Sequence, residues 1–176
     1  MRITGGKYRS RVVKCPPGVI RPAMDRMRES MFSILGDLRD LSFLDVFSGS
    51  GVIGLEAASR GATDIQLVEK DSGKKKVVME NLSIVSEKIK ISFIDAEIFL
   101  KNVKRDFDII HLDPPFPLQN KLKFIELIEK NKVLKKEGTL MMHYPDEESY
   151  PEQIGTLRQY DKRKYGRSIL IFYTRD

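Results

Sequence analysis

Short apolar runs alternate with stretches of helical periodicity along most of the chain. Apolar runs of strand length predict seven strands, at residues 41–47, 65–68, 89–94, 107–112, 139–143, 157–160 and 169–173. Apolar residues at helical spacing predict helices at residues 25–38, 72–85, 97–103 and 122–134, and a further helix that follows a glycine turn and reaches residue 60. This alternation is typical of an α/β fold with a mostly parallel sheet covered by helices on both faces. The last two strands are expected to form an antiparallel hairpin at the edge.

The chain has 176 residues, a length that suits a single domain. We expect residues 1–40 to form a basic N-terminal extension and helix, with Asp25 as its N-cap, and residues 41–176 to form the core. Residues 1–28 hold eight basic residues and one acid, a net charge of +7, whereas the whole chain carries +6. The positive excess therefore lies in one segment, which favours a polyanionic partner or a solvated basic tail. The candidate nucleic-acid contacts are Lys7, Arg9, Arg11, Arg21 and Arg28.

Several classes of protein are disfavoured by composition. No apolar run is long enough to span a bilayer, and the N-terminus lacks the apolar stretch of a signal peptide. Cys15 is the only cysteine, and His111 and His143 are the only histidines. An intrachain disulfide is therefore excluded, and a metal site is not expected. The simplest expectation is a monomeric protein of the reducing cytoplasm.

A glycine-rich turn follows the first predicted strand. Gly49, Gly51 and Gly54 form a G-x-G-x-x-G pattern, which lets the backbone turn sharply and approach a ligand closely. The pattern alone fits nicotinamide and flavin cofactors as well as S-adenosylmethionine. Asp45 stands before the glycines, where a carboxylate would receive a cationic amino group and repel a pyrophosphate. This favours S-adenosylmethionine.

Two further acids end the next strands. Glu69 is placed to accept the two hydroxyls of a ribose, a role that serves either class of cofactor. Asp95 is placed to accept an adenine amino group, or else to cap the following helix. The candidate cofactor-binding residues are Asp45, Phe47, Gly49, Gly51, Glu69, Lys70, Asp95, Ala96 and Asp113.

The tetrapeptide Asp113-Pro114-Pro115-Phe116 follows the fourth predicted strand, on the sheet edge where ligands bind in open α/β folds. Asp113 and the carbonyl of Pro114 would accept the two N–H groups of an exocyclic amine, so that its lone pair faces a methyl donor. The prolines stiffen the turn, and Phe116 offers a face for stacking a base. Alternatively, the tetrapeptide is only a turn that closes a strand. Its combination with the glycine turn favours the catalytic interpretation.

Both histidines lie in predicted strands. We interpret His111 and His143 as core residues or as residues that support the site, rather than as catalytic groups.

The chain resembles the RsmD-type methyltransferases, which form N2-methylguanine in bacterial small-subunit ribosomal RNA. Residues 2–11 are similar to the R-I-x-G-G-x-x-R-G-R start of that family, and residues 21–29 to its R-P-T-x-D-R-V-R-E segment. Residues 45–51 resemble its D-L-F-A-G-S-G loop, and residues 113–116 its D-P-P-F/Y motif. The last two motifs occur in many amino-methyltransferases, so the N-terminal pair is the more specific. Ala23 and Ser10 depart from the pattern, since the family has threonine and glycine there.

This resemblance implies a Rossmann-like class I methyltransferase fold with a seven-stranded sheet, S-adenosylmethionine as the methyl donor, and 16S ribosomal RNA or a 30S assembly particle as the substrate. The residues themselves leave other functions open: an adenine-N6 methyltransferase acting on nucleic acid, a protein glutamine-N5 methyltransferase, a dehydrogenase, or a non-catalytic RNA-binding assembly factor. A glutamine enzyme usually carries Asn in place of Asp113. A dehydrogenase leaves the tetrapeptide unexplained.

Overall fold

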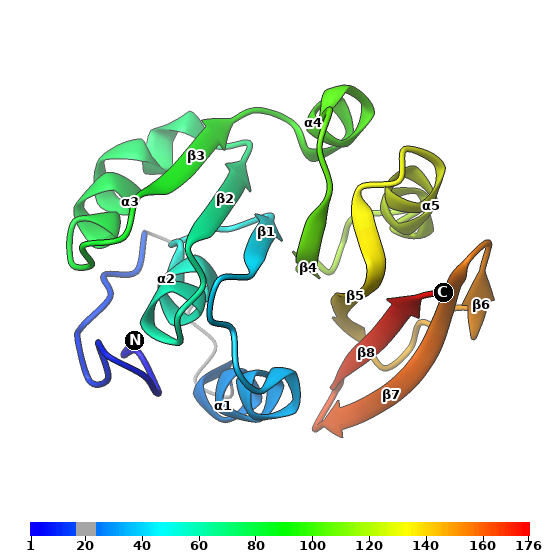
Figure 1. The fold of residues 1–176 in the computed structure, drawn as a ribbon, viewed down its shortest axis with the longest axis horizontal. Helices are drawn as coiled ribbons and strands as arrows, with labels where there is room; N and C mark the ends of the chain where they lie inside the picture. Colours follow the sequence, from blue (N-terminus) through cyan, green and yellow to red (C-terminus); the bar gives the residue numbers. More distant parts are fainter. Residues whose placement is uncertain (17–23) are drawn as a thin grey trace.

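The computed structural model describes residues 1–16 and 24–176 and contains one eight-stranded sheet (Figure 1). The strands are β1 Ser42–Val46, β2 Asp64–Glu69, β3 Ile89–Phe93, β4 Phe107–Leu112, β5 Leu134–Pro145, β6 Gln153–Ile154, β7 Leu157–Tyr165 and β8 Ser168–Arg175. The helices are α1 Met24–Leu35, α2 Val52–Ser59, α3 Lys75–Leu82, α4 Ala96–Asn102 and α5 Leu122–Lys130, with a 3-10 turn η1 Ser72–Lys74 before α3.

The strands are arranged in the order β3-β2-β1-β4-β5-β8-β7-β6. β1 to β5 are parallel, whereas β8, β7 and β6 follow as antiparallel neighbours. The α/β fold with a mostly parallel sheet and a closing antiparallel hairpin is therefore confirmed. From β1 the chain adds β2 and β3 on one side of the sheet and then β4 and β5 on the other. In such folds a crevice opens at the carboxyl ends of the two strands where the order changes, which are β1 and β4.

The structure differs from the sequence-based prediction in the number of strands and in the bounds of several elements. The sheet has eight strands rather than seven, because the two-residue strand β6 pairs with the start of β7. Helix α5 ends at Lys130 instead of residue 134, since Lys132 adopts a left-handed φ of 54° and Leu134 already pairs with β4. Asp25 does not cap α1, because the helix begins at Met24 and the Asp25 carboxylate accepts from Arg28 at 2.8 Å.

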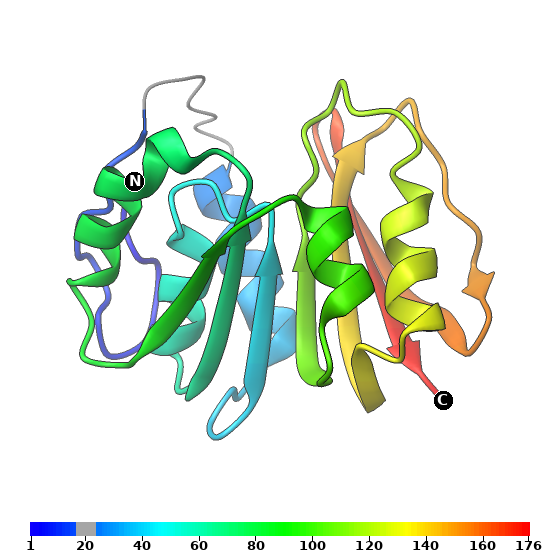
Figure 2. The ribbon, with the colours of Figure 1, turned by 90° about the horizontal axis from the view of Figure 1, so that it is seen from above.

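Helices cover both faces of the sheet. Figure 2 shows α4 and α5 in front of the strands and α1 and α2 behind them. Successive strand residues point to opposite faces, so Phe43 contributes to the core with α1, α2 and α3, and Leu44 to the core with α4 and α5. Because both faces are covered, β1 is buried at all five positions.

The N-terminal segment is packed into the domain rather than appended to it. Ile3, Tyr8 and Val13 are buried in the core shared with α1, α2 and α3. The backbone of this segment is bonded to the last residue of α2: the Lys7 N–H donates to the Ser59 carbonyl at 2.7 Å, and the Ser59 hydroxyl donates to the Gly5 carbonyl at 2.6 Å. Residues 1–14 therefore cover the end of α2 and supply part of the core.

Gly6 permits this close approach. It has φ of 77°, and a Cβ added there would lie 1.9 Å from the Ser59 carbonyl oxygen. No other residue type fits without displacing the segment from α2.

We predict that Gly6→Ala lowers the free energy of unfolding by at least about 2 kcal/mol, because the left-handed strain and the clash add together. Gly36→Ala is the matched control, since Gly36 has φ of 72° and a Cβ there meets nothing within 4 Å. Its cost is expected to be about 1 kcal/mol, from backbone strain alone. Urea denaturation followed by circular dichroism measures both values, and equal losses in the two variants would contradict the role assigned to Gly6.

Candidate active site

A cavity of about 490 Å³ opens beyond the carboxyl ends of β1, β2, β3 and β4. It is lined by Phe47, Gly49, Val68, Glu69, Lys70, Lys74, Ile94, Asp95, Ala96, Glu97, Asp113, Pro114, Pro115, Phe116, Leu118, Lys123 and Phe124. The structure thus brings the expected tetrapeptide together with most of the expected cofactor residues. Two of the latter, Asp45 and Gly51, are not on the wall of the cavity.

The glycine turn connects β1 to α2 beneath this cavity. Gly51 has φ of 80°, precedes the first turn of α2, and donates its N–H to the Ser48 carbonyl at 2.8 Å. Gly49 has φ of 56°, and a Cβ added there would meet nothing within 4 Å, because the residue borders open space. Gly51 therefore allows the backbone to turn into α2, whereas Gly49 leaves its backbone accessible from the cavity.

Phe47 stands at the end of β1 in an unusual conformation. Its φ is 69°, a left-handed value that costs a non-glycine residue about 1–2 kcal/mol. Its ring packs edge-on against Phe124 of α5, with centroids 5.0 Å apart. Strain of this kind persists only where the surrounding structure imposes it, and it is common at ligand sites. Nothing in the sequence signals this conformation.

Glu69 is held rigidly at the end of β2. Its two carboxylate oxygens accept N–H groups from Gly49 at 2.9 Å and from Asp71 at 2.8 Å, and Lys74 forms an ion pair with it at 3.3 Å. The Asp71 N–H and the Lys74 ammonium both lie against Oε1, whereas Oε2 accepts only the Gly49 N–H and so retains a lone pair for a ligand hydroxyl. The bond to Gly49 also ties the end of β2 to the glycine turn.

Asp95 caps α4, as one of the two sequence interpretations expected. Its side chain accepts from the Glu97 N–H at 2.9 Å and pairs with the Lys70 ammonium at 3.1 Å. Burial works against ionisation, yet these donors hold the pKa of Asp95 below its usual value. The carboxylate therefore stays charged at neutral pH at the rim of the cavity.

Asp45 lies under the cavity and is fully buried. Its Oδ1 is 2.8 Å from Nδ1 of His111 on β4, and its Oδ2 has no hydrogen-bond partner within the part of the chain that the structure describes. Burial raises the pKa of the Asp45 carboxyl, against the hydrogen bond from His111. Burial alone would lower the pKa of His111. The hydrogen bond to Asp45 and the negative charge of that carboxylate outweigh this effect, so the pKa of His111 is raised. His111 is thus a buried residue of the sheet that holds the Asp45 carboxylate.

Asp113 follows β4 and faces the cavity. Its Oδ1 is 2.8 Å from Nδ1 of His143 on β5, and the ring of Phe116 packs against the His143 ring with centroids 5.1 Å apart. Lys121 stabilises the turn. Its side chain is buried, and its ammonium donates to the Phe116 carbonyl at 2.8 Å and pairs with Glu148. The tetrapeptide therefore has a fixed backbone and two fixed side chains.

Sequence reasoning missed Lys121 and also Asn81. The Asn81 amide on α3 donates to the carbonyls of Ser50 and Lys14, both at 2.9 Å, and accepts the Lys14 N–H at 2.9 Å. One side chain thus connects the glycine turn, α3 and the N-terminal segment. Neither residue belongs to a recognisable motif. The one signal in the sequence is that Asn81 is a polar residue at a position of α3 where helical periodicity expects an apolar one.

No group of three or more metal-ligating side chains occurs among the residues that the structure describes. Over the same residues, no helix combines the length and apolar character needed to cross a bilayer.

Comparison with known proteins decides the family. A model of the family described as Conserved hypothetical protein 95 matches residues 1–174. Ribosomal RNA small subunit methyltransferase D of Escherichia coli (strain K12) is 31% identical over 180 residues, which covers 100% of this chain and 90% of that protein. The chain belongs to the RsmD family. The resemblance drawn from the sequence motifs is confirmed.

Other relatives agree. The protein of the same name from Buchnera aphidicola subsp. Baizongia pistaciae is 32% identical over 165 residues, covering 90% of this chain and 79% of that protein. The solved structure of yhhF from Escherichia coli is 30% identical and covers 100% of this chain and 98% of that chain, with a TM-score of 0.91.

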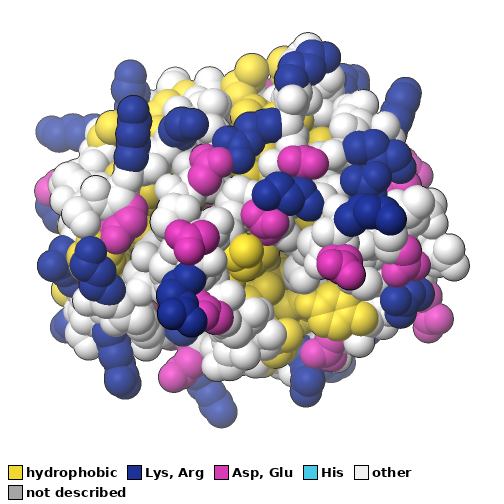
Figure 3. Space-filling model, in the orientation of Figure 1, with side chains coloured by type: hydrophobic (Ala, Val, Ile, Leu, Met, Phe, Trp, Pro, Cys, Tyr) yellow, Lys and Arg dark blue, Asp and Glu magenta, His cyan; other side chains and the backbone are white. Residues whose placement is uncertain are grey.

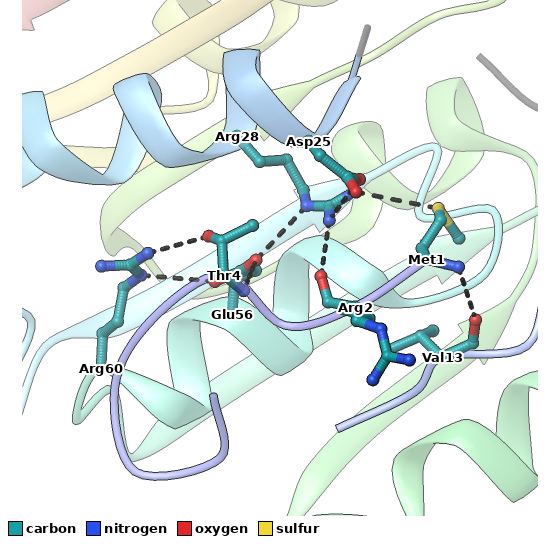
Figure 4. A network of polar contacts seen from close by, with 8 residues as sticks. All are labelled: Met1, Arg2, Thr4, Val13, Asp25, Arg28, Glu56 and Arg60. Atoms are coloured by element: carbon teal, nitrogen blue, oxygen red, sulfur yellow. Dashed lines mark hydrogen bonds and ion pairs between the residues drawn. The ribbon is translucent and has the colours of Figure 1, made fainter. Parts of the chain in front are cut away.

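The N-terminal motifs of the RsmD family have a structural explanation here (Figure 4). Glu56 is buried within α2 and accepts the Thr4 N–H at 2.7 Å, the Arg28 Nε–H at 3.3 Å and the Arg60 Nε–H at 3.4 Å. Arg28 also donates to the Arg2 carbonyl at 2.7 Å. The two motifs therefore meet at one buried carboxylate.

This arrangement corrects one expectation. Arg28 is 0% exposed and its donors are bonded to protein groups, so it does not contact RNA as the sequence suggested. Arg21 lies outside the described residues, as does Ala23. Lys7, Arg9 and Arg11 are exposed, and Lys7 pairs with Glu87 while Arg11 stacks on Tyr8.

We predict that Arg28→Leu lowers the free energy of unfolding by about 3–5 kcal/mol, because it removes one of the two arginines that pair with the buried Glu56 carboxylate, and the one that is itself fully buried. The control is Arg26→Leu, which removes an exposed arginine of the same helix and should change stability by no more than about 0.5 kcal/mol. Urea denaturation measures both. If Arg28→Leu instead kept full stability and lost only RNA affinity, the structural assignment of Arg28 would be wrong.

Proposed function

We propose that this protein transfers a methyl group from S-adenosylmethionine to the exocyclic N2 amino group of a guanine in 16S ribosomal RNA. The main support is that Asp113, Pro114, Pro115 and Phe116 share one cavity with Gly49, Glu69 and Asp95. Relatives that cover 90–100% of the chain are named as small-subunit ribosomal RNA methyltransferases. The choice of guanine N2 rests on the RsmD resemblance.

The cavity fits the proposed cofactor. Its volume of about 490 Å³ lies within the range of small-molecule sites. We assign the ribose hydroxyls to Glu69, the adenine edge to Asp95 with Lys70 and Ala96, and the methionine end to the backbone at Phe47 and Gly49, which line the cavity, with Gly51 shaping the turn that holds them.

S-adenosylmethionine supplies an electrophilic methyl group on a sulfonium. The chain itself would bind and orient the amine: the Asp113 carboxylate accepts one N–H, and the Pro114 carbonyl accepts the other. Both acceptors favour a nitrogen whose lone pair faces the methyl group, and Phe116 stacks on the base. Fixed acceptors contribute most because they need no reorganisation during the reaction, and the braced tetrapeptide meets that condition.

We predict that Asp113→Ala lowers the methylation rate by at least about a thousandfold while S-adenosylmethionine still binds. The loss follows from removing the acceptor that orients the amine. Asp113→Asn keeps an acceptor oxygen and the shape of the side chain, so it should retain more activity than the alanine variant. Labelled methyl transfer and calorimetric binding of the cofactor measure the two effects, and near-wild-type turnover in Asp113→Ala would exclude the proposed role.

The substrate is tested by incubating the protein with labelled S-adenosylmethionine and unmodified small subunits, followed by mapping of the methylated nucleotide. Label on guanine N2 of 16S RNA is expected. Label in protein would favour the glutamine-N5 alternative, and label on adenine would favour the N6 alternative.

The N-terminal segment remains the candidate surface for RNA phosphates, through Lys7, Arg9 and Arg11. The Lys7 N–H is bonded to Ser59, the last residue of α2, so Lys7 lies at the end of that helix away from the cavity. An eight-residue helix is about 12 Å long, a separation that a folded RNA readily spans. Figure 3 shows acidic and basic side chains interspersed over the face in view, so a single positive patch does not dominate there.

We predict that Arg9→Gln weakens RNA binding and reduces the slope of log K against log salt by about 0.7–0.9, the value for one phosphate contact. Deleting the whole segment is a poorer test, because it would expose the core around Ile3, Tyr8 and Val13. Lys136→Gln removes an exposed charge on β5, far along the chain, and serves as the control. Anisotropy titrations at several salt concentrations measure the slopes, and an equal change in both variants would argue against a specific contact at Arg9.

A further inference from the structure

His143 is the buried neighbour of the proposed catalytic aspartate. It lies on β5, one residue beyond Met142, which is paired with Leu112 at the end of β4, so His143 is level with Asp113, the residue that follows β4. The His143 side chain is 2% exposed, whereas that of Asp113 is 25% exposed and faces the cavity. The imidazole therefore sits behind the carboxylate, away from any substrate.

The hydrogen bond between them has a definite direction. An ionised carboxylate only accepts, so the His143 Nδ1 that lies 2.8 Å from Asp113 Oδ1 carries the proton and donates it. The other ring nitrogen, Nε2, is buried and has no partner in the described part of the chain. A proton on Nε2 would be a buried donor without an acceptor, which is costly. The ring is thus expected to carry its hydrogen on Nδ1 rather than on Nε2.

The same ring also contacts the other recognition element of the tetrapeptide. Phe116 packs against His143 with centroids 5.1 Å apart and the ring planes at 61°. A single buried side chain on β5 therefore touches both the proposed amine acceptor and the proposed stacking ring.

The chain contains a second pair of an aspartate and a histidine, which differs from the first in its position relative to the cavity. Asp45 and His111 are register partners on β1 and β4, with Nδ1 and Oδ1 also 2.8 Å apart. That pair is buried beneath the cavity, whereas Asp113 reaches the cavity wall. The two histidines of the chain thus each orient one aspartate, and only His143 orients the one at the tetrapeptide.

We propose that His143 is a positioning residue for methyl transfer: it donates Nδ1–H to Asp113 and supports Phe116, so that both face the target base in a fixed geometry. The proposal rests on the function proposed above. A small misplacement of an acceptor that aligns the amine is expected to slow the chemical step more than it weakens binding.

The test compares His143→Asn with His143→Leu. The asparagine amide nitrogen occupies the place of Nδ1 and can donate to Asp113, whereas leucine has nearly the same size and no donor. Both lose the ring contact with Phe116, so the difference between them isolates the hydrogen bond. We expect His143→Leu to lower kcat by about ten- to a hundredfold, with unchanged affinity for S-adenosylmethionine and little change in KM for RNA. His143→Asn should recover most of the lost kcat.

Equal losses in the two variants, or losses that appear only in KM or cofactor affinity, would overturn the proposal. Thermal denaturation of both variants separates an effect on stability from an effect on kcat. If His143→Leu is less stable than His143→Asn by enough to explain its lower kcat, the result also counts against a positioning role.

A second measurement does not depend on activity. In protein labelled with ¹⁵N-histidine, His143 is assigned by its loss in His143→Asn, because the chain has two histidines. Its nitrogen shifts should show the Nδ1–H tautomer in the wild type and change in Asp113→Ala. The Nε2–H tautomer, or shifts insensitive to Asp113, would refute the hydrogen bond. If the wild-type protein transfers no methyl group, the proposed function is refuted. The nitrogen shifts would still show whether His143 donates to Asp113.

Discussion

Helix α2 is buried along its whole length, and most of the structure is organised around that constraint. All eight of its residues are buried, including Glu56 and Ser59. Buried polar groups without partners are costly, so the carboxylate and the hydroxyl must be satisfied by other segments. Arg28 of α1 and the backbone of residues 4–8 supply those partners. The same helix begins at the glycine turn, so anchoring its far end also fixes the floor of the cavity.

The cavity edge follows a related rule. Parallel strands bring their carboxyl ends to one edge, where side chains leave the sheet and meet residues of the neighbouring strand. Asp45 with His111 and Asp113 with His143 are two instances, each between adjacent strands. Glu69 and Asp95 are held instead by backbone N–H groups and lysines. The acids of this edge therefore have fixed positions before any ligand is bound.

The positive charge of the N-terminal segment has more than one origin. The sequence suggested a basic extension directed at RNA, but Arg28 neutralises a buried carboxylate, and Lys7 and Lys14 pair with Glu87 and Glu80 on the surface. Charge counting treats all these residues alike, because it contains no information on burial. Only the exposed ones, Arg9 among them, remain candidates for phosphate contacts.

Hydrophobic periodicity and local backbone chemistry are properties of neighbouring residues, so the order of the main strands and helices, the glycine turn and the tetrapeptide were predictable without a structure. The sequence also predicted that Glu69, Asp95 and Asp113 meet, since the carboxyl ends of parallel strands share an edge. The tertiary structure alone decided the rest: the burial of Arg28, the left-handed Phe47, the bridging role of Asn81, and the pairing of each histidine with an aspartate on the next strand. These depend on which strands become neighbours and in which register, and contacts between residues far apart in the chain leave no local pattern.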